Sequence, residues 1–185
     1  MTEHHPQLIA VREDLRLAEE RLRRLSGALG EEDWLRDAPG GGWSAGACIE
    51  HLNLVTEAML PRLREGIEKA RALQQEGRPR LRKGLIGWML SAGSGPGRGM
   101  RIRTATAFDP HRLPTPGEIL ERWQALLADQ LALIEDSHGL PLDRVRMISP
   151  VDGRFSYNLY AALCILPAHH LRHIQQAEKA AGRGA

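Results

Sequence analysis

SYNLYAALCILPAHHLRHIQQAEKAA, residues 156–181, is the most informative stretch of the chain. Its apolar side chains recur every three or four residues, the period of a helix with one buried face. His169 and His173 lie four residues apart, so a helix places both imidazoles on one face with Cβ atoms about 5–6 Å apart. Pro167 is expected to kink or break this helix, because proline lacks an N–H donor and crowds the preceding turn.

Three upstream segments have the same amphipathic period, at about 6–29, 44–75 and 115–137. Four such segments predict an all-α protein, a four-helix bundle that forms a single domain over residues 1–185. The core must rest on Leu, Ala, Ile and Val, since aromatic residues make up only 4% of the chain.

Local signals mark the ends of these helices. Gly30 suits a C-terminal cap of the first helix, and Ser44 suits an N-cap of the second. Thr115 and Glu118 have the spacing of a capping box at the start of the third helix. Pro61 is expected to kink the second helix.

Residues 31–42 are expected to be a connection, and so is the polar stretch between the end of the third helix and Gly153. The longest irregular stretch, residues 77–116, is an insertion between the second and third helices that is rich in glycine and arginine. Within it, the apolar patch at residues 85–90 is expected to form a helical turn or two. Loops of this length are often functional or mobile.

Composition narrows the classes of partner. The net charge of +2 argues against a nucleic-acid binder, and aromatic residues do not interleave with the arginines of the insertion. No apolar run reaches the length of a membrane span, and the N-terminal residues lack the pattern of a signal peptide. Cys48 and Cys164 lie far apart and form no CxxC motif, which favours a reducing cytoplasm.

A third histidine extends the His169–His173 pair. Taken alone, a pair at this spacing is more often a solvated or core-edge pair than a metal site. His51, however, lies on the inward stripe of the second helix, and packed helices are about 8–10 Å apart. A divalent ion can bridge imidazoles across such a gap, so we expect the three side chains to converge on one point.

Several short motifs carry a family resemblance. Gly42-Trp43-Ser44, then Glu50-His51-Leu52, followed near the C-terminus by residues 169–176, HHLRHIQQ, resemble the signatures of the DinB/YfiT-like superfamily. The resemblance implies an up-down-down-up four-helix bundle that forms a homodimer. It also implies a site for a divalent ion such as zinc or nickel, with His51, His169 and His173 as ligands.

The resemblance also implies a range of activities. Family members include S-transferases and isomerases that use bacillithiol, mycothiol or related low-molecular-weight thiols, and others are described as metal-dependent hydrolases. Three protein ligands leave a coordination position open for water or for a thiol, so the ligand set does not choose between them. Gln176, three residues beyond His173, is a candidate to orient a ligand or a water. The alternative is a non-catalytic ligand-binding or stress-associated bundle.

The remaining candidates have plainer interpretations. Cys48 is a candidate fourth ligand or nucleophile, although a small buried hydrophobe is the commoner role. Arg172 would bind an anionic substrate group or remain a solvated helix residue. Trp43 is expected to anchor packing at the start of the second helix. Cys164 is expected in the core, and the histidines expected at the surface are His4, His5, His111, His138 and His170.

Overall fold

The computed structural model describes residues 4–39, 41–95 and 106–183, which contain six α-helices, two 3₁₀ turns and two short strands. The elements in chain order are α1 (Pro6–Ser26), α2 (Glu31–Leu35), α3 (Ala45–Ala72), α4 (Gly84–Ser94), η1 (Thr106–Phe108), α5 (Pro116–Glu135), η2 (Leu142–Arg144), β1 (Arg146–Ile148), β2 (Ser156–Asn158) and α6 (Leu159–Ala180).

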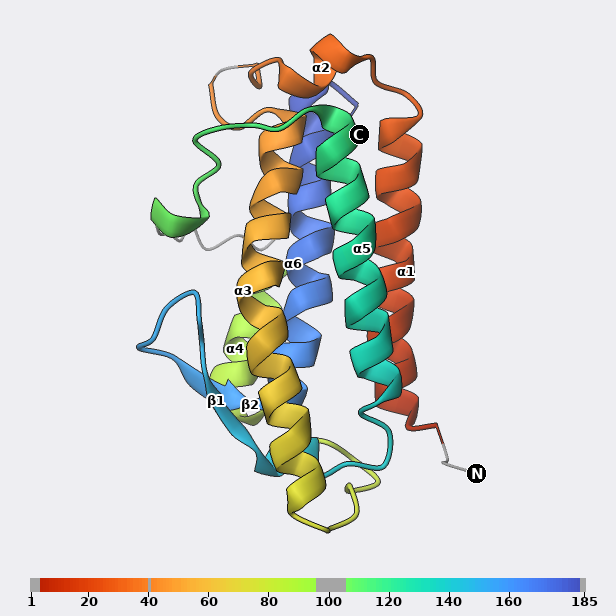
Figure 1. Ribbon diagram of the computed structural model, residues 1–185, viewed down its shortest axis with the longest axis vertical. Coiled ribbons are helices and arrows are strands. Elements are labelled where there is room, and N and C mark those ends of the chain that lie inside the picture. The colour runs from red at the N-terminus through yellow and green to blue at the C-terminus, as the bar shows by residue number, and fades with distance from the viewer. Residues whose placement is uncertain (1–3, 40, 96–105, 184–185) are drawn as a thin grey trace.

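Helices α1, α3, α5 and α6 lie side by side along the long axis of the molecule (Figure 1). Helix α3 packs against α5 and α6, and α1 packs against the same two helices. Their buried apolar residues form one hydrophobic cluster, to which every long helix contributes. The predicted all-helical class is confirmed, apart from the small sheet. No helix among residues 4–39, 41–95 and 106–183 is long and apolar enough to cross a bilayer.

Two predicted helix starts are found in the structure. The Ser44 hydroxyl accepts a hydrogen bond from the backbone N–H of Ala47 at 3.1 Å, which caps α3. At α5, Thr115 and Glu118 form the complete capping box, each side chain bonding to the backbone of the other. These caps satisfy N–H groups that the first turn of a helix leaves unpaired.

The predicted end of the first helix was wrong. Helix α1 ends at Ser26 with Gly27 as its C-cap, and Gly30 instead precedes a short helix, α2, within the expected connection. Trp34 explains the difference, because its indole is 2% exposed and belongs to the hydrophobic cluster. Burying so large an apolar side chain stabilises this turn of helix.

The irregular insertion also contains more structure than expected. Helix α4 has 11 residues and packs against α6. The contact requires a glycine, because a Cβ on Gly87 would lie 2.4 Å from the Cβ of Ala161. Three of the arginines of the insertion, Arg98, Arg101 and Arg103, lie outside the described residues.

The stretch before α6 is a small hairpin instead of a polar connection followed by helix. Strands β1 and β2 are antiparallel, with Met147 opposite Tyr157 and both side chains buried. Helix α6 therefore begins at Leu159 instead of Ser156, with the Asn158 side chain accepting from the N–H of Ala161.

Neither internal proline ends its helix. Helix α3 continues through Pro61 and α6 continues through Pro167, so of the two outcomes predicted at Pro167, a kink or a break, the break does not occur. Each proline removes one backbone hydrogen bond. Burial of residues on both sides of Pro167, such as Leu166 and Leu171, holds α6 together across this position.

Candidate metal centre

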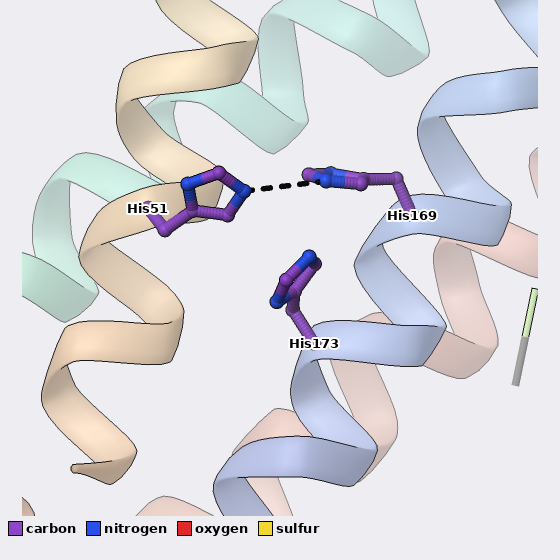
Figure 2. A group of neighbouring side chains, drawn as sticks. All are labelled: His51, His169 and His173. Carbon is purple, nitrogen blue, oxygen red and sulfur yellow. Dashed lines mark hydrogen bonds between the residues drawn. The ribbon is translucent and has the colours of Figure 1, made fainter. Parts of the chain in front are cut away.

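The three predicted histidines meet between α3 and α6. His51 extends from α3, and His169 and His173 extend from successive turns of α6 toward it (Figure 2). Each side chain offers one nitrogen to the group, and these nitrogens all lie within 4.8 Å of one another. The ring centroids of His51 and His173 are 4.6 Å apart, and those of His169 and His173 are 4.4 Å apart.

The distance between two of the nitrogens fits a bound ion. Nε2 of His51 and Nε2 of His169 are 3.3 Å apart. Two nitrogens at about 2.0–2.1 Å from a tetrahedral zinc ion would be separated by about 3.3–3.4 Å. This part of the cluster therefore has the separation that two imidazole ligands of one ion require.

A backbone carbonyl selects the tautomer of His51. Its Nδ1 lies 2.8 Å from the carbonyl oxygen of Phe108, which can only accept, so Nδ1 carries the proton and donates. Nε2 of the neutral ring is then an unprotonated lone pair that faces His169. Metal-binding histidines characteristically donate their other N–H to a carbonyl or carboxylate in this way.

The electrostatics keep the cluster neutral. Burial lowers the pKa of His51, although the Phe108 carbonyl and the charge of Asp109 oppose the shift. Burial, followed by the neighbouring His51, lowers the pKa of His173 to about 3. The pKa of His169 is lowered well below its ordinary value by desolvation and then by His173 and His51. Neutral imidazoles are the form that binds a metal ion.

One buried atom in the cluster lacks a partner. Nδ1 of His173 is buried and makes no hydrogen bond to the described residues. The nearby Gln176 side chain opposes the lowering of the His173 pKa, but only weakly and without a hydrogen bond to Nδ1. Buried polar atoms are normally satisfied, so this nitrogen is available to a group beyond the described side chains. The 3.3 Å separation of the two Nε2 atoms and the three neutral imidazoles fit a divalent ion.

An aromatic wall and a cavity adjoin the histidines. The ring centroid of Trp43 lies 4.8 Å from that of His51 and 6.0 Å from that of His173. Trp43 therefore packs against the histidines and borders the centre. A cavity of ≈ 330 Å³ is lined by Trp43, Cys48, Gln176, Lys179 and neighbouring residues. Cavities of this volume accommodate small molecules. A second cavity of the same size lies between α3 and the hairpin, away from the histidines.

His170 corrects a prediction, because it is 1% exposed instead of being at the surface. Its Nδ1 accepts from the indole N–H of Trp123 at 3.2 Å, and its Nε2 lies 3.4 Å from the hydroxyl of Thr56. Burial lowers the pKa of His170 to about 4. The prediction failed because Thr56 of α3 and Trp123 of α5 meet this face of α6, so a side chain that points away from the histidine pair still contacts protein.

The remaining candidates divide between exposed and buried positions. His4 and His111 are exposed as expected, whereas His138 is only 9% exposed, because the N-terminal segment packs over it. His5 is half-buried and caps α1 by accepting from the N–H of Gln7. Arg172 donates to the carbonyl of Gly93 at 3.1 Å and so contacts α4.

Both cysteines are buried and unpaired by disulfide. Burial raises the pKa of Cys48 to about 12 and also raises that of Cys164. Cys48 does not belong to the group of described side chains that could share an ion with His51. These properties match a small core residue rather than a ligand or a nucleophile.

Sequence reasoning missed two features that support the centre. The Phe108 carbonyl gives no sequence signal, because any residue could supply a backbone oxygen. Glu50, beside His51, is buried and accepts from Arg122 of α5 at 2.8 Å and from Asn53 at 3.1 Å. The signal for this second feature was the carboxylate of Glu50 among residues of α3 that are buried, because a buried charge requires a partner.

The fold and the cluster together define an all-helical protein with a buried group of three neutral histidines. Residues 14–177 match the family model described as the DinB superfamily. Because the match covers most of the chain, this chain belongs to the DinB superfamily, which confirms the resemblance seen in the motifs. Comparisons with curated proteins and with solved structures gave no match.

Proposed function

We propose that this protein is a metal-dependent enzyme that acts on a small molecule, with His51, His169 and His173 as the ligands of one divalent ion. The observation that carries the proposal is the tautomer of His51, whose Nε2 lone pair faces the Nε2 of His169 at 3.3 Å. Zinc and nickel are the ions that we favour, because imidazole suits both. Bound there, either ion would act as a Lewis acid with a position left for substrate or cofactor.

The reaction that we propose is S-transfer from a low-molecular-weight thiol of the bacillithiol or mycothiol type, or hydrolysis. The cysteines of the chain support an external thiol, since both are buried with raised pKa values and neither supplies a thiolate near neutral pH. The cavity beside Trp43 would receive the small molecule, and the ammonium of Lys179 on its wall suits a carboxylate.

One observation favours a second candidate, a non-catalytic ligand-binding or stress-associated bundle. The group formed by His51, His169 and His173 includes no carboxylate or cysteine from the described part of the chain. An enzyme that moves protons commonly places an acid or base within hydrogen-bond reach of its substrate. A bundle that only binds a ligand needs none.

The arrangement of the bundle is part of the same proposal. We infer an up-down-down-up order, supported by the chain directions in Figure 1, where α1 and α6 run one way and α3 and α5 the other. This order sets α3 antiparallel to α6, so His51 faces the His169–His173 pair. A homodimer and a cytoplasmic location stay predictions.

Elemental analysis of the purified protein tests the ligand assignment. We expect about one zinc or nickel ion per chain, lost in the His51→Ala, His169→Ala and His173→Ala variants. His111→Ala, a change at an exposed histidine, is the matched control and should keep the ion. Stoichiometric metal that survives all three changes would refute the assignment.

A panel of thiols with electrophilic and hydrolysable substrates tests the reaction. Turnover that disappears on chelation and returns with the ion would establish an enzyme. Cys48→Ala should keep that turnover, because a buried neutral thiol takes no part in it. Metal binding without turnover on any member of the panel would favour the non-catalytic candidate.

A further inference from the structure

Helix α4 presents an apolar face to solvent. Leu85 is 82% exposed and Trp88 63%, and Ile86 and Met89 are 39% and 43% exposed. These positions lie on one side of the helix, because residues three and four apart are neighbours on its surface. The opposite side is anchored on α6 through Gly87, which leaves no room for a side chain. The outward direction of the apolar face is therefore set by the packing of α4.

Such a face is unusual for this molecule. Every other large hydrophobic residue that is substantially exposed in the described ranges stands at a separate position in sequence, for example Leu35 or Ile148. Adjacent exposed apolar side chains typically mark an interaction surface. A tryptophan among them is characteristic of side chains that sit at the boundary between lipid and water.

The basic residues near this face indicate the charge of the partner. The described residues 77–95 contain four arginines and lysines and no aspartate or glutamate, whereas the rest of the chain has 21 basic and 23 acidic residues. Arg80 and Arg82 are exposed and form no ion pair with any described residue. Arg82 is exposed and lies three residues before Leu85, a span of at most about 10 Å, so it stands close to the border of the apolar face.

The two other cations in the segment just before α4 already have partners within the protein. Arg78 lies 3.6 Å from the carboxylate of Asp143, and Lys83 donates to the hydroxyl of Ser91 at 2.9 Å. Arg80 and Arg82 thus provide the positive charge that remains for a partner. A second copy of this chain would bring the same cations together, which is unfavourable, whereas an anionic surface would neutralise them.

We propose that α4 docks the protein on an anionic lipid surface, with Leu85, Ile86, Trp88 and Met89 entering the headgroup boundary and Arg80 and Arg82 contacting lipid phosphates. A helix that lies in the interface with apolar and basic groups in this arrangement binds membranes without crossing them. The binding is independent of the histidine centre and of the reaction proposed above.

Sedimentation of the full-length protein with lipid vesicles tests the proposal. We expect binding to vesicles of phosphatidylcholine and phosphatidylglycerol, little binding to phosphatidylcholine alone, and release near about 0.5 M salt, where surface charges are screened. Emission from Trp88 should shift to the blue on binding, since Trp88 is 63% exposed, whereas Trp34 and Trp123 are 2% exposed and Trp43 is half-buried.

Matched variants assign the binding to this surface. Arg80→Gln with Arg82→Gln should weaken binding about 30-fold, because each removed charge weakens binding about five-fold. The control pair is Arg23→Gln with Arg112→Gln, which removes equal charge at exposed sites elsewhere and should have a far smaller effect. Leu85→Ser with Trp88→Ser should weaken binding about 10-fold or more, whereas Leu35→Ser with Ile148→Ser should not.

Three results would overturn the proposal. The first is no sedimentation with anionic vesicles at low salt, and the second is equal loss of binding in a variant pair and its control. The third is a dimer in analytical ultracentrifugation that Leu85→Ser with Trp88→Ser dissociates, without vesicle binding by the original protein. That outcome would assign the face to a second copy of the chain. Circular dichroism verifies that each variant is folded.

Discussion

The histidine centre between α3 and α6 and a second cluster, formed by His4, Glu135 and His138, each bring three candidate ligand atoms close together. In each group the candidate ligand atoms lie within 4.8 Å of one another. In the second cluster, Nδ1 of His4 is 3.5 Å from Nε2 of His138, and both atoms are 3.9 Å from the Glu135 carboxylate. Distance alone would assign a metal ion to both.

The hydrogen-bond partners of the rings separate the two groups. Nδ1 of His138 accepts from the backbone N–H of His5 at 2.9 Å, so the proton of the neutral ring lies on Nε2, the atom that faces the cluster. At the centre the order is reversed, because Nδ1 of His51 donates to a carbonyl and leaves Nε2 as a lone pair. Glu135 is also engaged by Arg12 at 3.2 Å.

The comparison shows that the hydrogen-bond partner of one imidazole nitrogen determines whether the other nitrogen can bind a metal ion. The carbonyl that accepts from Nδ1 of His51 leaves Nε2 as a metal ligand. The N–H that donates to Nδ1 of His138 leaves the proton on Nε2, which is then a donor within the contact to the N-terminal segment. The first cluster is therefore a candidate metal centre, and the second is a hydrogen-bonded contact between the start of α1 and the end of α5.

The largest expected difference is the response to metal. Zinc at about 100 times its Kd stabilises a one-site protein by about 2.7 kcal/mol, which for a chain of this length raises the Tm by about 5–10 °C. Calorimetry should show this rise for the original protein and for His138→Ala, and no rise for His173→Ala. A rise that survives in His173→Ala but vanishes in His138→Ala would reverse the two assignments.

The next effect concerns stability without metal. His138→Ala removes a buried ring that accepts from His5 and contacts His4 edge-on, with ring centroids 4.7 Å apart. We expect the free energy of unfolding in urea to fall by about 1–2 kcal/mol, the cost of an unsatisfied donor. His111→Ala, at an exposed position, is the control and should be near neutral. Equal losses in both variants would remove the structural role of the second cluster.

Local patterns predicted the four long helices because period and capping are encoded within each segment, as at Ser44 and at Thr115 with Glu118. Helix α2 escaped prediction because burial of Trp34 in the hydrophobic cluster is a tertiary contact. The same holds for α4, whose packing depends on Gly87 meeting Ala161 across a long separation in sequence.

The candidate site was predictable in part. The spacing of His169 and His173 and the motif around His51 indicated which side chains converge. The carbonyl of Phe108 was not predictable, because it comes from the insertion, whose path follows from packing rather than from periodicity. The burial of His170 was missed for a related reason, since one helix face can be inferred from sequence but the number of neighbours around it cannot.

A smaller effect is the pH dependence of stability from His138. Burial lowers the pKa of His138, and His4, His5 and Arg12 act in the same direction, while Glu135 opposes them. The folded pKa lies below the unfolded value, so the stabilising contribution is complete above about pH 6.5 and is lost as the pH falls. In metal-free protein, His138→Gln should show a shallower loss of unfolding free energy between about pH 7 and 5 than the original protein. Superimposable pH profiles would contradict this role.

The finest distinction is the tautomer of each ring, which ¹⁵N spectra of histidine-labelled, metal-free protein measure directly. His51 should carry its proton on Nδ1, because the carbonyl of Phe108 accepts from that atom. His138 should carry its proton on Nε2, because His5 donates to Nδ1. Added zinc should shift the Nε2 signal of His51 and leave both nitrogens of His138 unchanged, with His51→Gln and His138→Gln providing the assignments. A proton on Nε2 of His51 would remove the lone pair on which the metal centre depends, and the two clusters would then be chemically alike.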